Sequence, residues 1–234
     1  AKDTYEIDEF DCGSIFVLVG ADKAMVIDTG SGIGDLRGVI ANITDKPIVL
    51  VITHAHGDHV GGLGWFDDYY MNKEDVGKYA MEGVDFRRQY AGFIAQRSGK
   101  EYAYNVEEDI RPWPADANPV RHDLEDGQTF DLGGGRIVTA MRAPGHTPGS
   151  MVLIDPTTRI LFAGDACNCN TLFGSLPGSE DEGVLSFGFL PQPAAAPAAS
   201  VSTSSRARRR IVIFLGRSSC RSPPLRASTR RMRV

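Results

Sequence analysis

Residues 54–62, with the sequence HAHGDHVGG, concentrate groups that bind metal ions. Three imidazoles and one carboxylate fall close together there, at His54, His56, Asp58 and His59. Alternate side chains of an extended segment point the same way, so we expect His54, His56 and Asp58 on one side of the chain. His59 would follow where the chain turns. This ligand set suits Zn²⁺ and is also acceptable to Fe or Mn. The stretch therefore predicts a metal site.

Two later residues fit the same site. His146 stands between glycine-containing turns in the sequence PGHTPGS, and Asp165 ends the hydrophobic run LFAGD. Either residue alone is a weak signal, because a histidine or aspartate in a turn usually serves local hydrogen bonding. The remaining histidine outside the motif, His122, is interpreted as solvated or structural.

The elements that position these residues are short strands and helices in α/β order. Val- and Ile-rich runs at residues 14–20, 24–28 and 47–53 predict buried strands, and residues 33–43 suit a helix between the last two. In such folds the active loops follow the carboxyl ends of strands, and the third run leads directly into His54. Further on we expect helices over 74–81 and 84–96, and strands over 136–142, 151–154 and 160–163.

The chain contains the motif IDTG at residues 27–30, followed by THAHGDH, PGHTPGS and FAGD. These motifs resemble those of the metallo-β-lactamase superfamily in order and spacing over about residues 10–170. The resemblance implies a four-layer αββα sandwich and a dinuclear, usually zinc, site. It implies that one ion is held by His54, His56 and His146, and the second by Asp58 and His59, with Asp165 bridging the two. Asp28 and Thr53 match positions that orient a ligand, or else cap a turn.

The implied chemistry is hydrolysis by a metal-bound hydroxide. Two divalent ions roughly 3.5–4 Å apart lower the pKa of a shared water towards about 7 and polarise the bond to be cleaved. Asp58 is the catalytic candidate, because besides ligating it can accept or return a proton. No Ser-His-Asp or Cys-His alternative is apparent in the sequence.

The chain departs from the family pattern after His146, where the late histidine that completes the second metal site is missing. The second ion would then keep only Asp58, His59 and Asp165 and bind weakly. Cys167 and Cys169 follow Asp165 closely, and a thiolate from this pair is one possible replacement ligand. The alternative is that both cysteines are buried or lie near the ligands without contacting metal.

Composition divides the chain near residue 183. Residues 1–182 contain all 30 acidic residues and 15 Lys and Arg, whereas residues 183–234 contain ten Arg and no Asp, Glu or Lys. We interpret 1–182 as the hydrolase domain and 183–234 as a disordered or non-native Arg/Ala/Pro/Ser-rich tail. Three hypotheses account for the tail: a gene read out of frame, a basic segment that binds nucleic acid, or an inert extension. The first also explains the missing histidine, and it leaves the sandwich incomplete at its C-terminal part.

The predicted substrate is a small ester, thioester, lactone or lactam. Residues 63–118 contain eleven aromatic residues, which suit the wall of a partly apolar pocket. The acidic body argues against a nuclease, so nucleic acid is expected only through the Arg-rich tail. The alternatives are a nucleic-acid-processing member of the superfamily and an inactive truncated product.

The overall composition places the protein among globular domains. It is 42% hydrophobic and has no apolar run of 18 residues, so no membrane span is expected. The first ten residues show no secretory signal, and the four cysteines are too scattered for a disulfide framework. These features predict a cytoplasmic protein.

Overall fold

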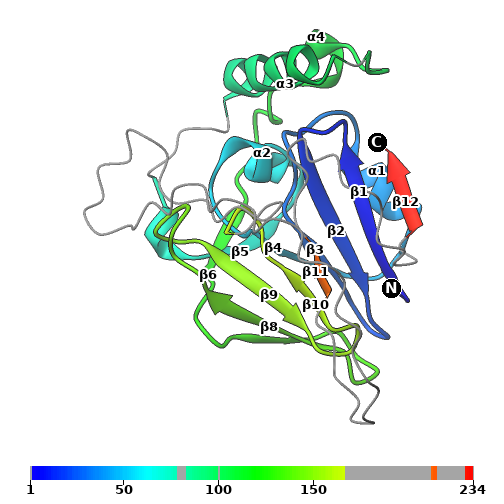
Figure 1. The fold of residues 1–234 in the computed structure, drawn as a ribbon, viewed down its shortest axis with the longest axis vertical. Coiled ribbons are helices and arrows are strands. Elements are labelled where there is room, and N and C mark those ends of the chain that lie inside the picture. Colours follow the sequence, from blue (N-terminus) through cyan, green and yellow to red (C-terminus); the bar gives the residue numbers. More distant parts are fainter. Residues whose placement is uncertain (1, 78–82, 100, 167–211, 215–229, 234) are drawn as a thin grey trace, which may run out of the picture.

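Two β-sheets pack face to face in the computed structural model, which describes residues 2–77, 83–99, 101–166, 212–214 and 230–233 (Figure 1). The larger sheet has the order β12-β1-β2-β3-β4-β5-β6, made of β1 (Thr4–Glu9), β2 (Gly13–Val19), β3 (Ala24–Ile27), β4 (Ile48–Val51), β5 (Asp68–Met71), β6 (Val120–Asp123) and β12 (Arg230–Arg233). The smaller sheet has the order β11-β10-β9-β8-β7, made of β7 (Thr129–Asp131), β8 (Ile137–Arg142), β9 (Met151–Asp155), β10 (Ile160–Phe162) and β11 (Val212–Phe214).

Strand direction brings the chemically active loops to one edge. In the larger sheet β3, β4, β5 and β6 run parallel, so the segments that follow β3 and β4 leave the sheet at the same end. In the smaller sheet the loop between antiparallel β8 and β9 and the segment after β10 carry His146 and Asp165. The candidate ligands therefore come from both sheets.

The hydrophobic core fills the space between the sheets. Along β2, Phe16 and Leu18 face the smaller sheet, whereas Ile15 and Val17 belong to a second cluster on the opposite face. The rings of Phe16 and Phe162 meet across the interface with centroids 5.0 Å apart. Because the central strands are buried on both faces, they appear in the sequence as continuous apolar runs.

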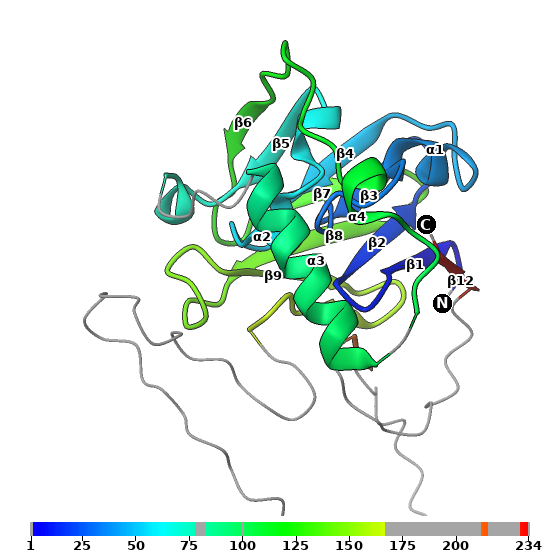
Figure 2. The same ribbon diagram turned by 90° about the horizontal axis from the view of Figure 1, so that it is seen from above.

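Helices cover the outer face of the larger sheet and the edge where the loops gather. Helix α1 (Leu36–Ala41) packs on the second cluster through Leu36 and Ile40. Near the loops lie α2 (Gly57–Val60), α3 (Val84–Ser98) and α4 (Val106–Asp109), with 3-10 turns η1 (Leu63–Trp65) and η2 (Lys73–Asp75) between α2 and α3 in the chain (Figures 1 and 2). Among the described residues, no helix is long and apolar enough to cross a membrane.

The smaller sheet exposes apolar side chains on its outer face, where the expected fourth layer would pack. Ile137 and Met141 of β8 are each 43% exposed. The described residues thus provide the helix, sheet and sheet layers of the α/β sandwich. The tail at 183–234 and the pair Cys167 and Cys169 lie outside the described residues, except for β11 beside β10 and β12 beside β1.

Most predicted elements are present with shifted bounds, and two expectations are wrong. The strands predicted at 14–20, 24–28, 47–53, 136–142, 151–154 and 160–163 correspond to β2, β3, β4, β8, β9 and β10, and the helix predicted at 84–96 is α3. The helix predicted at 74–81 is not formed over residues 74–77, the part of this range that the structure describes, because η2 ends at Asp75 and Val76 is extended. The extended segment predicted from His54 to Asp58 ends at His56, since Asp58 lies in α2.

Candidate metal centre

The centre is built on a hydrogen-bonded platform formed by Asp28 and Thr53, which follow the parallel strands β3 and β4. The Asp28 carboxylate accepts hydrogen bonds from the Thr53 backbone N–H at 2.7 Å and from its hydroxyl at 2.8 Å. Its Oδ2 also lies 2.8 Å from Nδ1 of His59. Asp28 has a φ of 64°, a left-handed conformation that aspartate tolerates better than most residues. The platform therefore orients the ring of His59.

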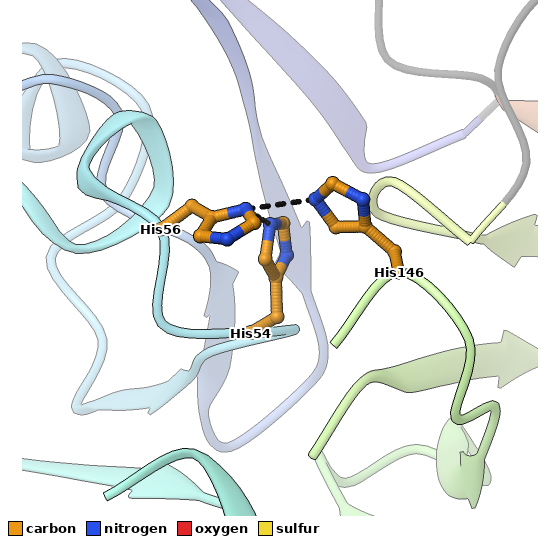
Figure 3. Close-up of side chains that lie close together, drawn as sticks. All are labelled: His54, His56 and His146. Atoms are coloured by element: carbon orange, nitrogen blue, oxygen red, sulfur yellow. Dashed lines mark hydrogen bonds between the residues drawn. The ribbon is translucent and has the colours of Figure 1, made fainter. Parts of the chain in front are cut away.

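Three histidines converge above this platform. Nε2 of His54 lies 3.1 Å from Nδ1 of His56, which lies 2.8 Å from Nε2 of His146 (Figure 3). Each residue offers one ring nitrogen, and these nitrogens all lie within 4.8 Å of one another. Because His54 and His56 are separated by one residue of extended chain, their rings project to the same side, as the sequence predicted.

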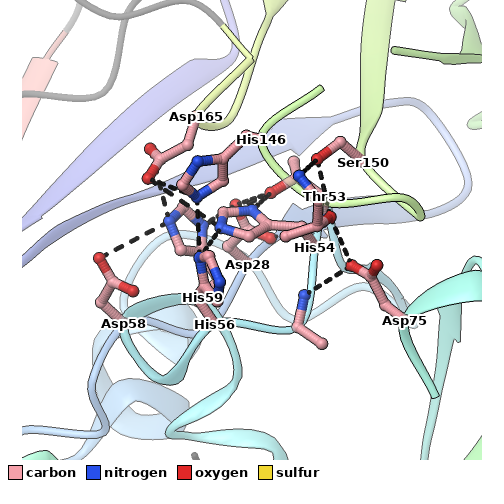
Figure 4. A network of polar contacts seen from close by, with 12 residues as sticks. Asp28, Thr53, His54, His56, Asp58, His59, Asp75, His146, Ser150 and Asp165 are labelled. Atoms are coloured by element: carbon pink, nitrogen blue, oxygen red, sulfur yellow. Dashed lines mark hydrogen bonds and ion pairs between the residues drawn. The ribbon is translucent and has the colours of Figure 1, made fainter. Parts of the chain in front are cut away.

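Asp165 lies beside both the three-histidine group and His59 (Figure 4). Its Oδ2 is 3.4 Å from Nε2 of His146 and 4.0 Å from Nε2 of His54. Its Oδ1 is 3.7 Å from Nε2 of His59. Oδ2 of this carboxylate thus faces His146 and His54, and Oδ1 faces His59. His54, His59 and Asp165 form a second possible ligand group, which shares His54 with the first.

Asp58 reaches the centre from α2, beside His59. Its Oδ2 lies 3.8 Å from Nε2 of His59 and accepts a hydrogen bond of 2.9 Å from the hydroxyl of Tyr90 in α3. The strand alternation used for the prediction does not apply to Asp58. Asp58 lies in the first turn of α2, which begins after His56, and its carboxylate lies beside His59.

The protonation of these groups follows from burial and from the surrounding charges. Burial lowers the pKa of His54 and His56, and it lowers that of His146 to about 4, so these rings are neutral near pH 7. Burial alone would lower the pKa of His59, but Asp28, Asp58 and Asp165 raise it well above its usual value. His59 therefore lies in a strongly negative environment.

The donor set fits a divalent cation. Neutral imidazoles present lone pairs, and carboxylates that raise the pKa of a neighbouring histidine favour a metal cation for the same electrostatic reason. His122 takes no part, since it lies in β6 with Nε2 3.6 Å from Asp68 and its side chain is 43% exposed. All six candidate ligands, His54, His56, Asp58, His59, His146 and Asp165, lie at this one edge of the sheets.

Asp75 joins the two loops that carry the three histidines, and sequence reasoning did not identify it. Its Oδ2 accepts hydrogen bonds from the Ala55 N–H at 3.1 Å and from the Thr147 hydroxyl at 2.8 Å. Its Oδ1 accepts one of 2.7 Å from the Gly149 N–H (Figure 4). Nothing in the KED sequence around Asp75 distinguishes it from a surface acid, because all three donors belong to distant segments.

The comparison with known families agrees with this geometry. The family model described as "Metallo-beta-lactamase superfamily" matches residues 10–206. The chain therefore belongs to the metallo-beta-lactamase superfamily, which confirms the predicted family and its α/β fold.

Individual relatives carry several activities. The acyl-coenzyme A thioesterase MBLAC2 of Bos taurus is 30% identical over 180 residues, which cover 71% of this chain and 62% of that protein. The linear primary-alkylsulfatase of Pseudomonas sp. (strain ATCC 19151) is 27% identical over 180 residues, covering 67% of this chain and 34% of that protein. A solved metallo-beta-lactamase family protein from Thermus thermophilus superposes with a TM-score of 0.48 and 21% identity, covering 74% and 62% of the two chains. This chain spans about 62% of the length of the thioesterases.

Proposed function

We propose that this chain is a dinuclear zinc hydrolase that cleaves a small acyl substrate, with a thioester as the first candidate. The observation that carries the proposal is the position of Asp165. One of its oxygens faces His146 and the other faces His59, at 3.4 Å and 3.7 Å. A carboxylate shared in this way supports two adjacent ions rather than one.

The residues divide into two ligand sets around that carboxylate. His54, His56 and His146 would hold one ion, whereas Asp58 and His59 would hold the other, with Asp165 shared. When bound, such ions supply Lewis-acid polarisation of the scissile carbonyl and lower the pKa of a water molecule to about 7. Nitrogen and carboxylate ligands favour zinc, and iron or manganese are the alternatives.

The chain's own residues supply orientation and proton transfer. The Asp28 platform holds the His59 ring through Nδ1, which leaves Nε2 directed towards Asp58 and Asp165. The Tyr90 hydroxyl donates to Oδ2 of Asp58, so Oδ1 is the atom that would accept a proton from the attacking water and return it to the leaving group. His54, His59 and His146 are buried, which limits the access of competing water to their ring nitrogens.

A thioester is favoured over the other acyl substrates by the named relatives. Thioesterases from Bos taurus, Homo sapiens and Gallus gallus, each named acyl-coenzyme A thioesterase MBLAC2, are 28–30% identical to this chain. Esters, lactones and lactams present the same carbonyl chemistry and form the rest of the panel. A nucleic-acid substrate is disfavoured because residues 1–182 contain 30 acidic residues and only 15 Lys and Arg.

The test combines metal content with turnover in the full chain. After exhaustive dialysis, elemental analysis is expected to find about two zinc ions per chain, and a panel of thioesters, esters, lactones and lactams should include a substrate. His56→Ala should lose metal and turnover together, whereas the matched variant His122→Ala should keep both. One ion or fewer, with no turnover of any panel member, would contradict the proposal.

A further inference from the structure

Helix α3 presents an aromatic face beside the candidate metal centre. Phe86, Tyr90 and Phe93 are spaced four and three residues apart, which places them on one face of the helix. The rings of Phe86 and Tyr90 stack, with centroids 6.3 Å apart and planes inclined by 13°. Phe86 is 37% exposed and Phe93 is 55% exposed. Two phenyl rings therefore remain in contact with solvent on either side of Tyr90.

Tyr90 packs against the cluster that holds α3 to the rest of the protein, whereas Phe86 and Phe93 are not part of that cluster. The buried residues of the helix are Arg87 and Ala91, which lie on a different side. The Arg87 guanidinium donates to the backbone carbonyls of Ser31 and Arg111, and Ala91 packs in a cluster with Phe10 and Ile33. Since other residues anchor the helix, packing does not account for Phe86 and Phe93.

The aromatic face is continuous with the centre through Tyr90. The Tyr90 hydroxyl lies 2.9 Å from Oδ2 of Asp58, whereas the Tyr90 ring stacks on Phe86. Helix α3 passes directly beside α2, which carries Asp58 (Figures 1 and 2). A substrate that extends from the centre along α3 would therefore have its reacting end near Asp58 and its remaining part against the rings of Phe86, Tyr90 and Phe93.

We propose that Phe86, Tyr90 and Phe93 form the binding site for the apolar acyl chain of the substrate, an inference that rests on the proposed thioester hydrolysis. Exposed phenyl rings next to a reaction centre offer apolar area to a substrate. The acyl chain, not the leaving group, is the part assigned here, because the three side chains carry no cation that would recognise phosphate or carboxylate. The site selects for chain length, because each methylene that reaches the rings loses contact with water.

The test measures how activity depends on acyl length in the zinc-loaded full chain. Thioesters with two to sixteen acyl carbons and one common leaving group are compared in the unchanged protein, in the double variant Phe86→Gln/Phe93→Gln and in Val120→Thr. Glutamine preserves helix propensity. Val120 on β6 is the matched control, because its side chain has the same 55% exposure as that of Phe93. We expect kcat/KM to rise by about two- to fourfold for each added methylene that reaches the rings. The double variant should lose this rise, and Val120→Thr should retain it.

Binding to metal-free protein separates this inference from the proposed function. Thioether analogues, which cannot be hydrolysed, should bind more tightly with increasing chain length by calorimetry, and the double variant should lose that dependence. If the analogues show the dependence but no thioester is cleaved, the acyl site stands and the proposed function fails. If thioesters are cleaved without a length dependence, or if the dependence survives in the double variant, the acyl site is wrong.

Discussion

Asp75 accepts a hydrogen bond of 2.8 Å from the hydroxyl of Thr147, the residue that follows His146. The same oxygen accepts from the N–H of Ala55, which lies between His54 and His56. One buried carboxylate thus connects the two loops that supply the three histidines, although these loops belong to different sheets.

Replacing Asp75 with Asn should loosen this connection and weaken metal binding. An amide cannot accept at both ends, so either the Gly149 N–H or the two donors at Oδ2, the Ala55 N–H and the Thr147 hydroxyl, lose their acceptor. We expect zinc affinity of the three-histidine site to fall about 10- to 100-fold in competition titrations with a chelator. Asp67→Asn, at an exposed position, is the control. Equal zinc affinities in the two variants would show that Asp75 does not set the ligand geometry.

Tyr90→Phe should weaken the Asp58 side of the centre. The substitution removes only the hydroxyl that donates to Asp58, and the ring stays on Phe86. We expect the second ion to bind roughly 10-fold more weakly while the first is unaffected. The matched control is Tyr102→Phe, which removes a hydrogen bond of 2.6 Å to Asp11 away from the ligands. Metal titrations that do not distinguish the two variants would argue against a role for Tyr90.

Glu9 predicts a pH dependence of stability in the metal-free protein. It accepts hydrogen bonds from the N–H groups of Ser31 and Ile33, and burial raises its pKa from 4.5 to about 7. The folded state therefore binds this proton more tightly than the unfolded state. Its contribution to stability is complete below pH 4.5 and is lost as the pH rises through 7.

The size of this effect follows from the shift in the pKa of Glu9. Between pH 4.5 and 8 the free energy of unfolding should fall by at most about 3 kcal/mol relative to Glu9→Gln. Urea denaturation of both proteins at several pH values measures the difference. Glu74→Gln, at an exposed site, should follow the unchanged protein. A pH-independent difference between Glu9→Gln and the unchanged protein would refute the prediction.

Arg136 supports the sandwich at the end remote from the candidate ligands. Its guanidinium donates to Oδ2 of the fully buried Asp155 at 2.6 Å and to the Thr4 hydroxyl at 2.6 Å, so it ties β1 to the smaller sheet. Arg136→Leu leaves Asp155 buried without its cation, and we expect a loss of about 3–5 kcal/mol in the free energy of unfolding. Arg111→Leu, at an exposed position, should change stability little. A small effect of Arg136→Leu would mean that water replaces the cation.

The sequence by itself determined the local part of the centre. His54 and His56 share one side because they are two residues apart in extended chain, and this spacing needs no distant partner. The central strands were recognisable because burial on both faces makes them continuous apolar runs. Strands β1, β5, β6 and β7 were not recognised, because their mixed composition becomes strand only through pairing with neighbours.

Only the tertiary structure decided how the distant residues meet. The packing of the sheets brings His146 to within 2.8 Å of His56 although 90 residues separate them. The short helix α2, rather than the extended segment that was predicted, positions Asp58. The partners of Asp75 and Tyr90 depend on loop and helix placement, which local spacing does not encode. Residue types thus set the chemistry of the centre, and long-range hydrogen bonds and packing set its geometry.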